Sequence, residues 1–165
     1  MSPAEALARR AAACPAYRLV EGMLLAHPWG DDLRADRMRV LRIEVGGAYC
    51  VDVSCLGFDE APDFWPTDVL HAGWLPDLAD PATLGALLAL VRERYPDAYA
   101  AREGRSWWVH DAEGTPLCAL PGAYETRQRG ESCCVGGPCH RPAAGATEAE
   151  ALVLALEAAG VPDAR

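Results

Sequence analysis

The sequence predicts an α+β fold, in which helices pack on one face of an antiparallel sheet built from β-hairpins. Three observations predict this class: a proline-started amphipathic segment in mid-chain, paired β-rich runs that flank turns, and helix-favouring segments near both ends. At 165 residues the chain is long enough for one domain with a proper core and too short for two ordinary ones. We therefore expect residues 1–165 to form a single α+β domain.

The segment formed by residues 81–95 has the clearest pattern. Asp80 precedes Pro81, which is typical of a helix start, because the carboxylate can accept from free amides and proline lacks an N–H there. Pro96 disfavours continuation of the helix. Apolar side chains recur at steps of three and four residues, which predicts one buried side: Leu84, Leu87, Leu88, Val91 and Tyr95.

Helices are also expected near both ends of the chain. Ser2-Pro3-Ala4-Glu5 has the form of a capping box, and the helix that it starts should run to about Ala13. Thr147-Glu148-Ala149-Glu150 is a second capping box, followed by a helix over residues 148–159 that Gly160 stops. Three side chains of this last helix should face inward: Leu152, Val153 and Leu156.

The β-rich runs predict two hairpins. Residues 38–45 and 48–55 flank Gly46-Gly47, with Tyr49 and Val51 expected on one face and Cys50 half-exposed on the other. Residues 106–110 and 115–120 flank a four-residue turn. A brief strand is expected within residues 23–27.

Two connections are expected to be irregular. Residues 57–73 contain Pro62 and Pro66, which should prevent regular structure, and residues 122–146 are polar and rich in glycine and proline.

Composition excludes some functions. The net charge of −9 and the pI near 4.8 argue against nucleic-acid binding, which depends on clustered cations. The chain has no apolar run of about 18 residues and no secretion signal, so we expect no membrane partner and a cytoplasmic protein of a bacterial host. It also has no lysine, which excludes Schiff-base chemistry and a P-loop lysine.

One cluster of residues could bind zinc. Thiolates and imidazoles are the ligands that Zn²⁺ prefers, and they gather at Cys133, Cys134, Cys139 and His140, with Cys118 or another distant cysteine to complete the set. The adjacent Cys133 and Cys134 depart from the usual C-x2-C or C-x4-C spacing, because neighbouring side chains tend to point in different directions. The sequence leaves two interpretations open, a zinc site and an exposed loop whose thiols bind nothing, and it favours the second.

The first irregular connection is the candidate partner-binding surface. It combines carboxylates, which could face a basic partner, with aromatic side chains, which are enriched where protein surfaces anchor a partner. A solvated acidic loop is the alternative, and a Ca²⁺-binding loop motif is absent. The candidate residues are Phe58, Asp59, Glu60, Asp63, Phe64, Trp65, Asp68 and Trp74.

No residue is assigned a catalytic role. His110-Asp111 could be a base with its orienting carboxylate, but adjacent residues rarely point at one another, and no G-x-S-x-G motif is present. The favoured interpretation is structural, with a tryptophan of Trp107-Trp108 in the core and His110 at a strand end.

Three segments resemble small uncharacterised accessory proteins of tailed phages and prophages from GC-rich bacteria: DFWPTDVL, GWLPDLADPATLGALLALVRE and ATEAEALVLALEAAG. The resemblance covers about half the chain and rests most on the WLPDL-x-DPATLG stretch. It implies a phage context, and it brings no activity, cofactor or catalytic residue.

These observations lead to one main hypothesis and two alternatives. We expect a non-enzymatic phage-type accessory protein that binds another macromolecule, a protein, through the acidic aromatic connection. The alternatives are a small zinc-stabilised structural module and an uncharacterised hydrolase whose scattered Asp, Glu and His residues converge in space.

Overall fold

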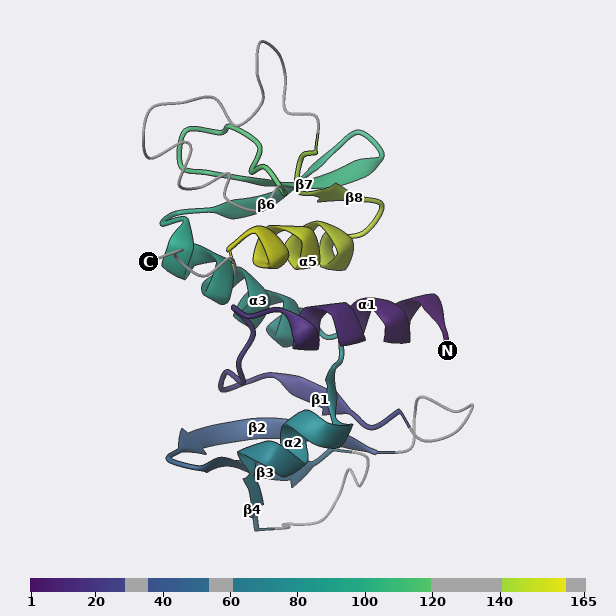
Figure 1. Ribbon diagram of the computed structural model, residues 1–165, viewed down its shortest axis with the longest axis vertical. Coiled ribbons are helices and arrows are strands. Elements are labelled where there is room, and N and C mark those ends of the chain that lie inside the picture. Colours follow the sequence, from purple (N-terminus) through teal and green to yellow (C-terminus); the bar gives the residue numbers. More distant parts are fainter. Residues whose placement is uncertain (29–35, 54–60, 120–140, 160–165) are drawn as a thin grey trace. The chain divides into compact units, whose positions relative to one another are not determined.

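A computed structural model of the chain describes residues 1–28, 36–53, 61–119 and 141–159. The chain divides into two compact units, one formed by Met1–Ala12 with Arg18–Ala86 and one by Ala13–Tyr17 with Leu87–Arg165. In the described residues the elements are four helices and eight strands, and the strands form two antiparallel sheets (Figure 1). The α+β class predicted from the sequence is therefore confirmed, with the strands of the two units in separate sheets.

The first unit contains a five-stranded antiparallel sheet with the strand order β4-β3-β2-β1-β5. Its central hairpin, β2 with β3, is the predicted one with the turn one residue earlier, at Val45-Gly46, and Gly46 adopts φ +89° there, a conformation that favours glycine. The brief strand expected near residue 25 is also present as β1. The bounds are β1 Leu24–Ala26, β2 Arg37–Glu44, β3 Gly47–Asp52, β4 Asp63–Pro66 and β5 Leu75–Pro76.

The connection expected to be irregular contains regular structure, so that prediction was wrong for its described part. Residues 63–66 form β4, and Thr67–Gly73 forms the short helix α2. Pro66 ends the strand and has φ −59° immediately before the helix, which is a position that suits proline. An edge strand also tolerates proline, because one side of its backbone needs no ladder hydrogen bond. Residues 54–60 lie outside the described part of the chain.

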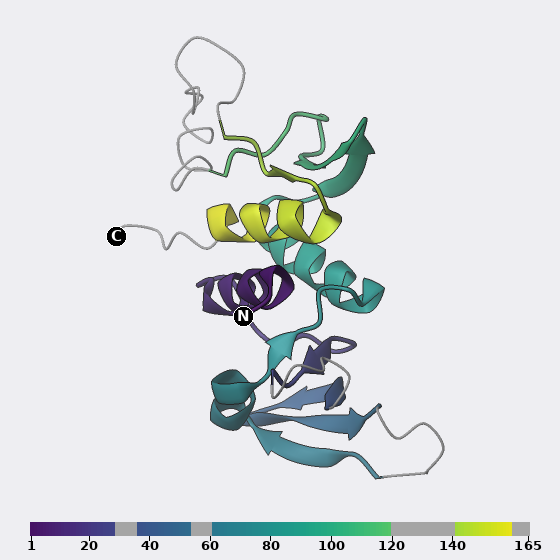
Figure 2. The same cartoon turned by 90° about the vertical axis from the view of Figure 1, so that its right-hand side faces the viewer.

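The buried face of β3 differs from the prediction. Ala48 and Cys50 are buried, at 0% and 2% exposure, while Tyr49 and Val51 are only half-buried. The reason is α2, which packs against β3 and β4 and covers the face that carries Ala48 and Cys50 (Figures 1 and 2). Because side chains alternate along a strand, this cover decides which half of them is buried.

Both terminal helices begin with the predicted side-chain cap, but the full capping box forms only at the second of them, because the Glu5 carboxylate of the first accepts from Arg9 instead. In α1 (Pro3–Ala13), the amide of Glu5 donates to Ser2 Oγ at 3.1 Å. In α5 (Glu148–Ala159), the amide of Glu150 donates to Thr147 Oγ1 at 3.2 Å, and the amide of Thr147 donates back to Glu150 Oε2 at 3.3 Å. These reciprocal bonds satisfy amides that have no partner within a helix.

Helix α3 (Pro81–Arg94) begins where the sequence predicts, with the amide of Thr83 donating to Asp80 Oδ2 at 2.8 Å. Of the predicted buried side, Leu87, Val91 and Tyr95 are buried, whereas Leu84 and Leu88 are half-buried. The apolar pattern of this helix did not include Thr83, which is fully buried although it is polar. Its hydroxyl can be buried because it accepts from the amide of Leu24 at 2.8 Å.

The second unit contains a three-stranded antiparallel sheet, β6 (Tyr99–Glu103), β7 (Ser106–His110) and β8 (Ala144–Gly145), in that order. Helix α5 packs against this sheet, and its Leu152, Val153 and Leu156 are fully buried as predicted (Figures 1 and 2). The predicted pairing of residues 106–110 with 115–120 is present in part. The amide of Asp111 donates to the carbonyl of Thr115 at 3.0 Å, the amide of Leu117 donates to the carbonyl of Val109 at 2.7 Å, and His110 makes an isolated antiparallel bridge with Pro116. The ladder partners of β7 are instead β6 and β8. Residues 120–140 lie outside the described part of the chain.

Among the described residues, no helix combines the length and the apolar character needed to cross a membrane.

Candidate functional site

An open groove in the first unit is the candidate functional site. His27 reaches it from the end of β1, Trp65 from β4, and Trp74 from the link between α2 and β5. Helix α2 supplies the remaining wall. We call this site the aromatic groove, and its lining residues are His27, Trp65, Asp68, Val69, Ala72, Gly73 and Trp74.

The three rings of the groove contact one another edge to face. The centroids of Trp65 and Trp74 lie 6.0 Å apart with their planes at 70°. The centroids of His27 and Trp74 lie 5.0 Å apart with their planes at 77°. Such pairs contribute about 0.5–1.5 kcal/mol each beyond their buried area. Trp74 therefore connects the other two rings.

Gly73 allows the histidine to approach α2. A Cβ atom at this position would lie 2.9 Å from His27 Nε2, closer than such atoms approach in proteins. A larger residue would require the imidazole ring to move. The sequence therefore places glycine at the last residue of α2, where the groove needs close contact.

The backbone around the groove is held by hydrogen bonds and a buried anchor. The amide of Trp74 donates to the carbonyl of Leu70 at 3.0 Å, and the amide of Thr67 donates to the carbonyl of Gly46 at 3.0 Å. The side chain of Leu70 is 1% exposed and anchors α2 on the sheet. These contacts fix both ends of α2 and thereby position the tryptophans.

The structure brings together three of the eight residues predicted for partner binding. Trp65, Asp68 and Trp74 line the aromatic groove, whereas Asp63 is exposed on β4 and does not line it. The remaining described candidate, Phe64, is treated below. Three predicted residues lie outside the described part of the chain: Phe58, Asp59 and Glu60.

Phe64 lies on the opposite face of β4 from Trp65. Its ring meets Tyr49 edge to face at 5.3 Å, and the Arg42 guanidinium lies 4.7 Å from the centroid of Tyr49. A Cβ atom on Gly47 would collide with the Phe64 ring, so glycine makes room for it. Because neighbours on a strand face opposite sides, Phe64 and Trp65 belong to different surfaces.

Sequence reasoning missed four residues of the groove: His27, Val69, Ala72 and Gly73. The last three depend on α2, whose helical spacing of 69, 72 and 73 was hidden because Pro66 had been taken to prevent regular structure. No local signal could identify His27, since it comes from a distant part of the chain.

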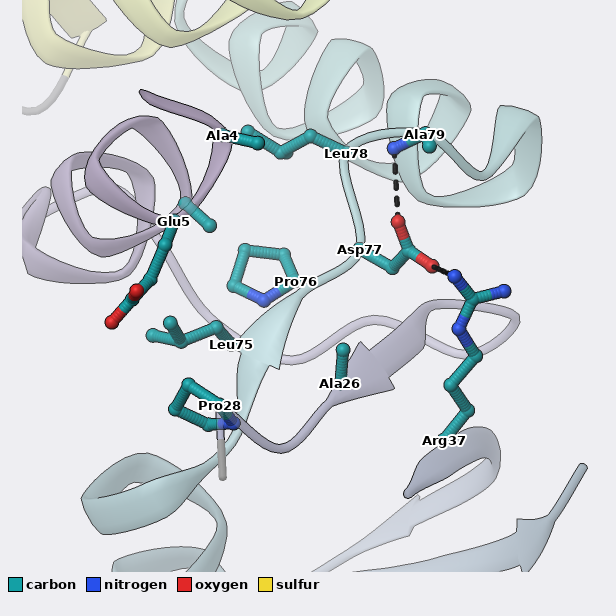
Figure 3. A pocket seen from close by; sticks show the side chains of 11 residues that line it. Ala4, Glu5, Ala26, Pro28, Arg37, Leu75, Pro76, Asp77, Leu78 and Ala79 are labelled. Atoms are coloured by element: carbon teal, nitrogen blue, oxygen red, sulfur yellow. Dashed lines mark hydrogen bonds and ion pairs between the residues drawn. The ribbon is translucent and has the colours of Figure 1, made fainter. Parts of the chain in front are cut away.

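A second hollow in the first unit is small and apolar (Figure 3). Its volume is about 160 Å³, and Leu75 and Pro76 of β5 form much of the wall drawn there. At one side of it, Arg37 Nη2 lies 3.2 Å from Asp77 Oδ2, and Asp77 Oδ1 accepts from the amide of Ala79 at 3.0 Å. This cavity could hold a small apolar group, but its mostly apolar lining offers few polar contacts that would select a particular ligand.

His110 and Asp111 form hydrogen bonds with different groups. His110 Nδ1 donates to the carbonyl of Gly114 at 3.1 Å, since a carbonyl can only accept, and Nε2 lies 3.2 Å from Glu103 Oε1. Asp111 Oδ1 instead accepts from the amides of Glu113 at 3.1 Å and Thr115 at 2.8 Å. The carboxylate therefore closes its own turn, and the geometry favours the structural interpretation.

The proposed zinc ligands Cys133, Cys134, Cys139 and His140 lie outside the described part of the chain. Within the described residues, no group of three or more His, Cys, Asp or Glu side chains could hold a metal ion. Cys118 is buried there. The zinc hypothesis therefore stays a prediction from the sequence.

Comparisons with protein-family models, with curated proteins and with solved structures find no match for this chain. The resemblance to phage accessory proteins stays an expectation.

Proposed function

We propose that this chain is a non-enzymatic accessory protein that binds another protein through the aromatic groove. The observation that carries the proposal is the edge-to-face set of His27, Trp65 and Trp74, all three half-buried around an open groove. Tryptophan is among the residues that contribute most binding energy at protein interfaces.

The groove presents its rings in an ordered setting. Trp74 is held by ring contacts on two sides and by the hydrogen bond from its amide to Leu70. Ordering a flexible side chain on binding costs about 0.5–1.5 kcal/mol, so rings that are already ordered bind at a smaller cost.

The hydrogen bonds made by the candidate catalytic side chains support a non-enzymatic role. In the described residues, the strongest candidate was His110 with Asp111, and the hydrogen bonds of both side chains hold the turn that follows β7. As part of the same proposal, the resemblance to phage accessory proteins places the chain in the cytoplasm of a bacterial host.

Capture from a bacterial lysate tests the proposal when it is made with matched variants. Tagged full-length protein should retain a specific partner, and Trp65→Ala with Trp74→Ala should abolish retention. Phe64→Ala is the control, because Phe64 is an exposed aromatic residue of the same strand that faces away from the groove. Circular dichroism would establish that each variant is folded.

Retention that survives the double tryptophan change would eliminate the groove as the binding surface. Equal loss for the tryptophan variant and the phenylalanine variant would also count against it, because the two changes alter different faces of β4.

A further inference from the structure

We infer that the aromatic groove accepts a cationic side chain, an arginine or a lysine, from its protein partner. This inference rests on the proposed function and names the chemistry that the groove recognises. Two features of the described residues carry it: the ring arrangement and the charge of the surrounding chain.

The rings form walls that suit a cation. Cations are attracted to the face of an indole ring within about 6 Å of its centroid, and tryptophan is the best of the aromatic residues for this contact. The planes of Trp65 and Trp74 stand at 70°, and those of His27 and Trp74 at 77°. Rings at such steep angles enclose a corner, so more than one ring can contact the same guest.

Asp68 supplies a negative charge at this corner. It lines the groove, it is exposed, and within the described residues it makes no ion pair. A guanidinium or ammonium group that entered between the rings could therefore also pair with its carboxylate. Ion pairs with carboxylates are strongest for arginine, whose planar fork can donate two parallel hydrogen bonds.

The segment that supplies six of the seven lining residues contains no arginine or lysine. Residues 43–91 contain no arginine or lysine, and they contain eight carboxylates: Glu44, Asp52, Asp59, Glu60, Asp63, Asp68, Asp77 and Asp80. Arginines from β2 pair with three of these in the structure, Arg42 with Glu44, Arg37 with Asp77 and Arg39 with Asp80. Asp68, which lines the groove, makes none of these three pairs, in a chain whose net charge is −9.

An apolar side chain is the competing occupant. Val69 and Ala72 line the groove together with the rings, and a leucine or phenylalanine could contact all of them. Such a guest would gain nothing from the charge of Asp68. The dependence of binding on this carboxylate therefore distinguishes the two occupants.

Selection from a random peptide library on the full-length protein at pH 8 tests the inference. Peptides that depend on Trp65 and Trp74 should be enriched in arginine or lysine. Replacing that residue with citrulline or acetyl-lysine, which removes the charge and keeps most of the shape, should weaken binding about tenfold.

Asp68→Asn should weaken the same peptides about fivefold. Asp63→Asn is the matched control, because it makes the same change of charge at an exposed position that does not line the groove, and it should change affinity by less than about twofold.

The outcomes separate this inference from the proposed function. Peptides that depend on the two tryptophans but tolerate citrulline and Asp68→Asn would overturn the cation inference and leave protein binding in place. An equal effect of Asp63→Asn and Asp68→Asn would overturn it as well, since the attraction would then be unspecific. A failure to select any peptide that depends on the tryptophans would refute both.

Discussion

Asp80 connects the start of α3 to the sheet of the first unit, and its replacement should be costly. Its Oδ2 accepts from the amide and the hydroxyl of Thr83, at 2.8 and 2.9 Å. The Arg39 guanidinium donates to both carboxylate oxygens, at 3.0 and 3.1 Å. One side chain therefore caps a helix and pairs with an arginine of β2.

The magnitude follows from these contacts. A helix cap contributes about 1 kcal/mol, and a hydrogen-bonded charge pair about 1.5–3 kcal/mol. The Asp80 and Arg39 side chains are only 13% and 28% exposed, so screening by water is limited. Asp80→Asn, which can still cap, should lower the free energy of unfolding by about 2 kcal/mol. Asp80→Ala should lower it by about 3 kcal/mol, because it removes both roles.

The loss should depend on pH in a defined direction. Burial raises the pKa of Asp80, but hydrogen bonds from Arg39 and Thr83 outweigh this effect, and the pKa lies below its ordinary value. A carboxyl with a lowered pKa stabilises the folded state above its unfolded pKa of about 4, and this stabilisation disappears as the pH falls through the folded pKa.

Urea unfolding of the wild type and the two variants between pH 7 and pH 3 measures this prediction. The difference between wild type and Asp80→Asn should be largest at pH 7 and should shrink below about pH 4. A difference that is absent at pH 7, or that stays constant down to pH 3, would refute the role given to this carboxylate.

Three further predictions concern other parts of the chain. Thr147→Ala removes the hydroxyl that caps α5 and should cost about 1 kcal/mol in urea unfolding; an unchanged midpoint would argue against the cap. Gly73→Ala should change stability by less than about 1 kcal/mol, because alanine favours a helix, yet it should reduce partner capture by displacing His27; capture equal to wild type would contradict this. Burial raises the pKa of the Cys14 and Cys50 thiols, so at pH 8 both should react more slowly with iodoacetamide in native protein than in urea, as peptide mass spectrometry would show; equal rates would disprove their burial.

Local signals predicted the starts and ends of helices well. The Asp80-Pro81 start and the capping box at Thr147 depend on residues within one helical turn, so the sequence contains all the information needed. The β2–β3 hairpin was also predictable, because β-rich runs flank a glycine turn.

Features that depend on tertiary packing, such as the buried face of a strand, were not predictable in the same way. Cys50 is buried because α2 covers its face of β3, and that helix was not expected after Pro66. Strand β6 was also missed. The partner of β7 was instead sought later in the chain, although Glu103 and Ser106 pair across a turn of only two residues.

The candidate site was predicted in part. Trp65, Asp68 and Trp74 were chosen for their chemistry, and the structure places them in one groove. Phe64 was chosen for the same reason, but it lies on the other face of β4. This was missed because the segment was taken for a loop, in which side chains are not expected to alternate between two faces. His27 lies in the groove because β1 pairs with β5, a contact between segments that are distant in sequence.

The affinity of the full-length chain for its captured partner, measured for wild type, Trp74→Ala and Phe64→Ala, tests the central claim most directly. Removing a tryptophan that anchors an interface costs about 2 kcal/mol or more, so Kd should rise about thirtyfold for Trp74→Ala. It should change by less than about twofold for Phe64→Ala. An unchanged Kd for Trp74→Ala, in a variant shown to be folded, would contradict the assignment of the aromatic groove as the binding site.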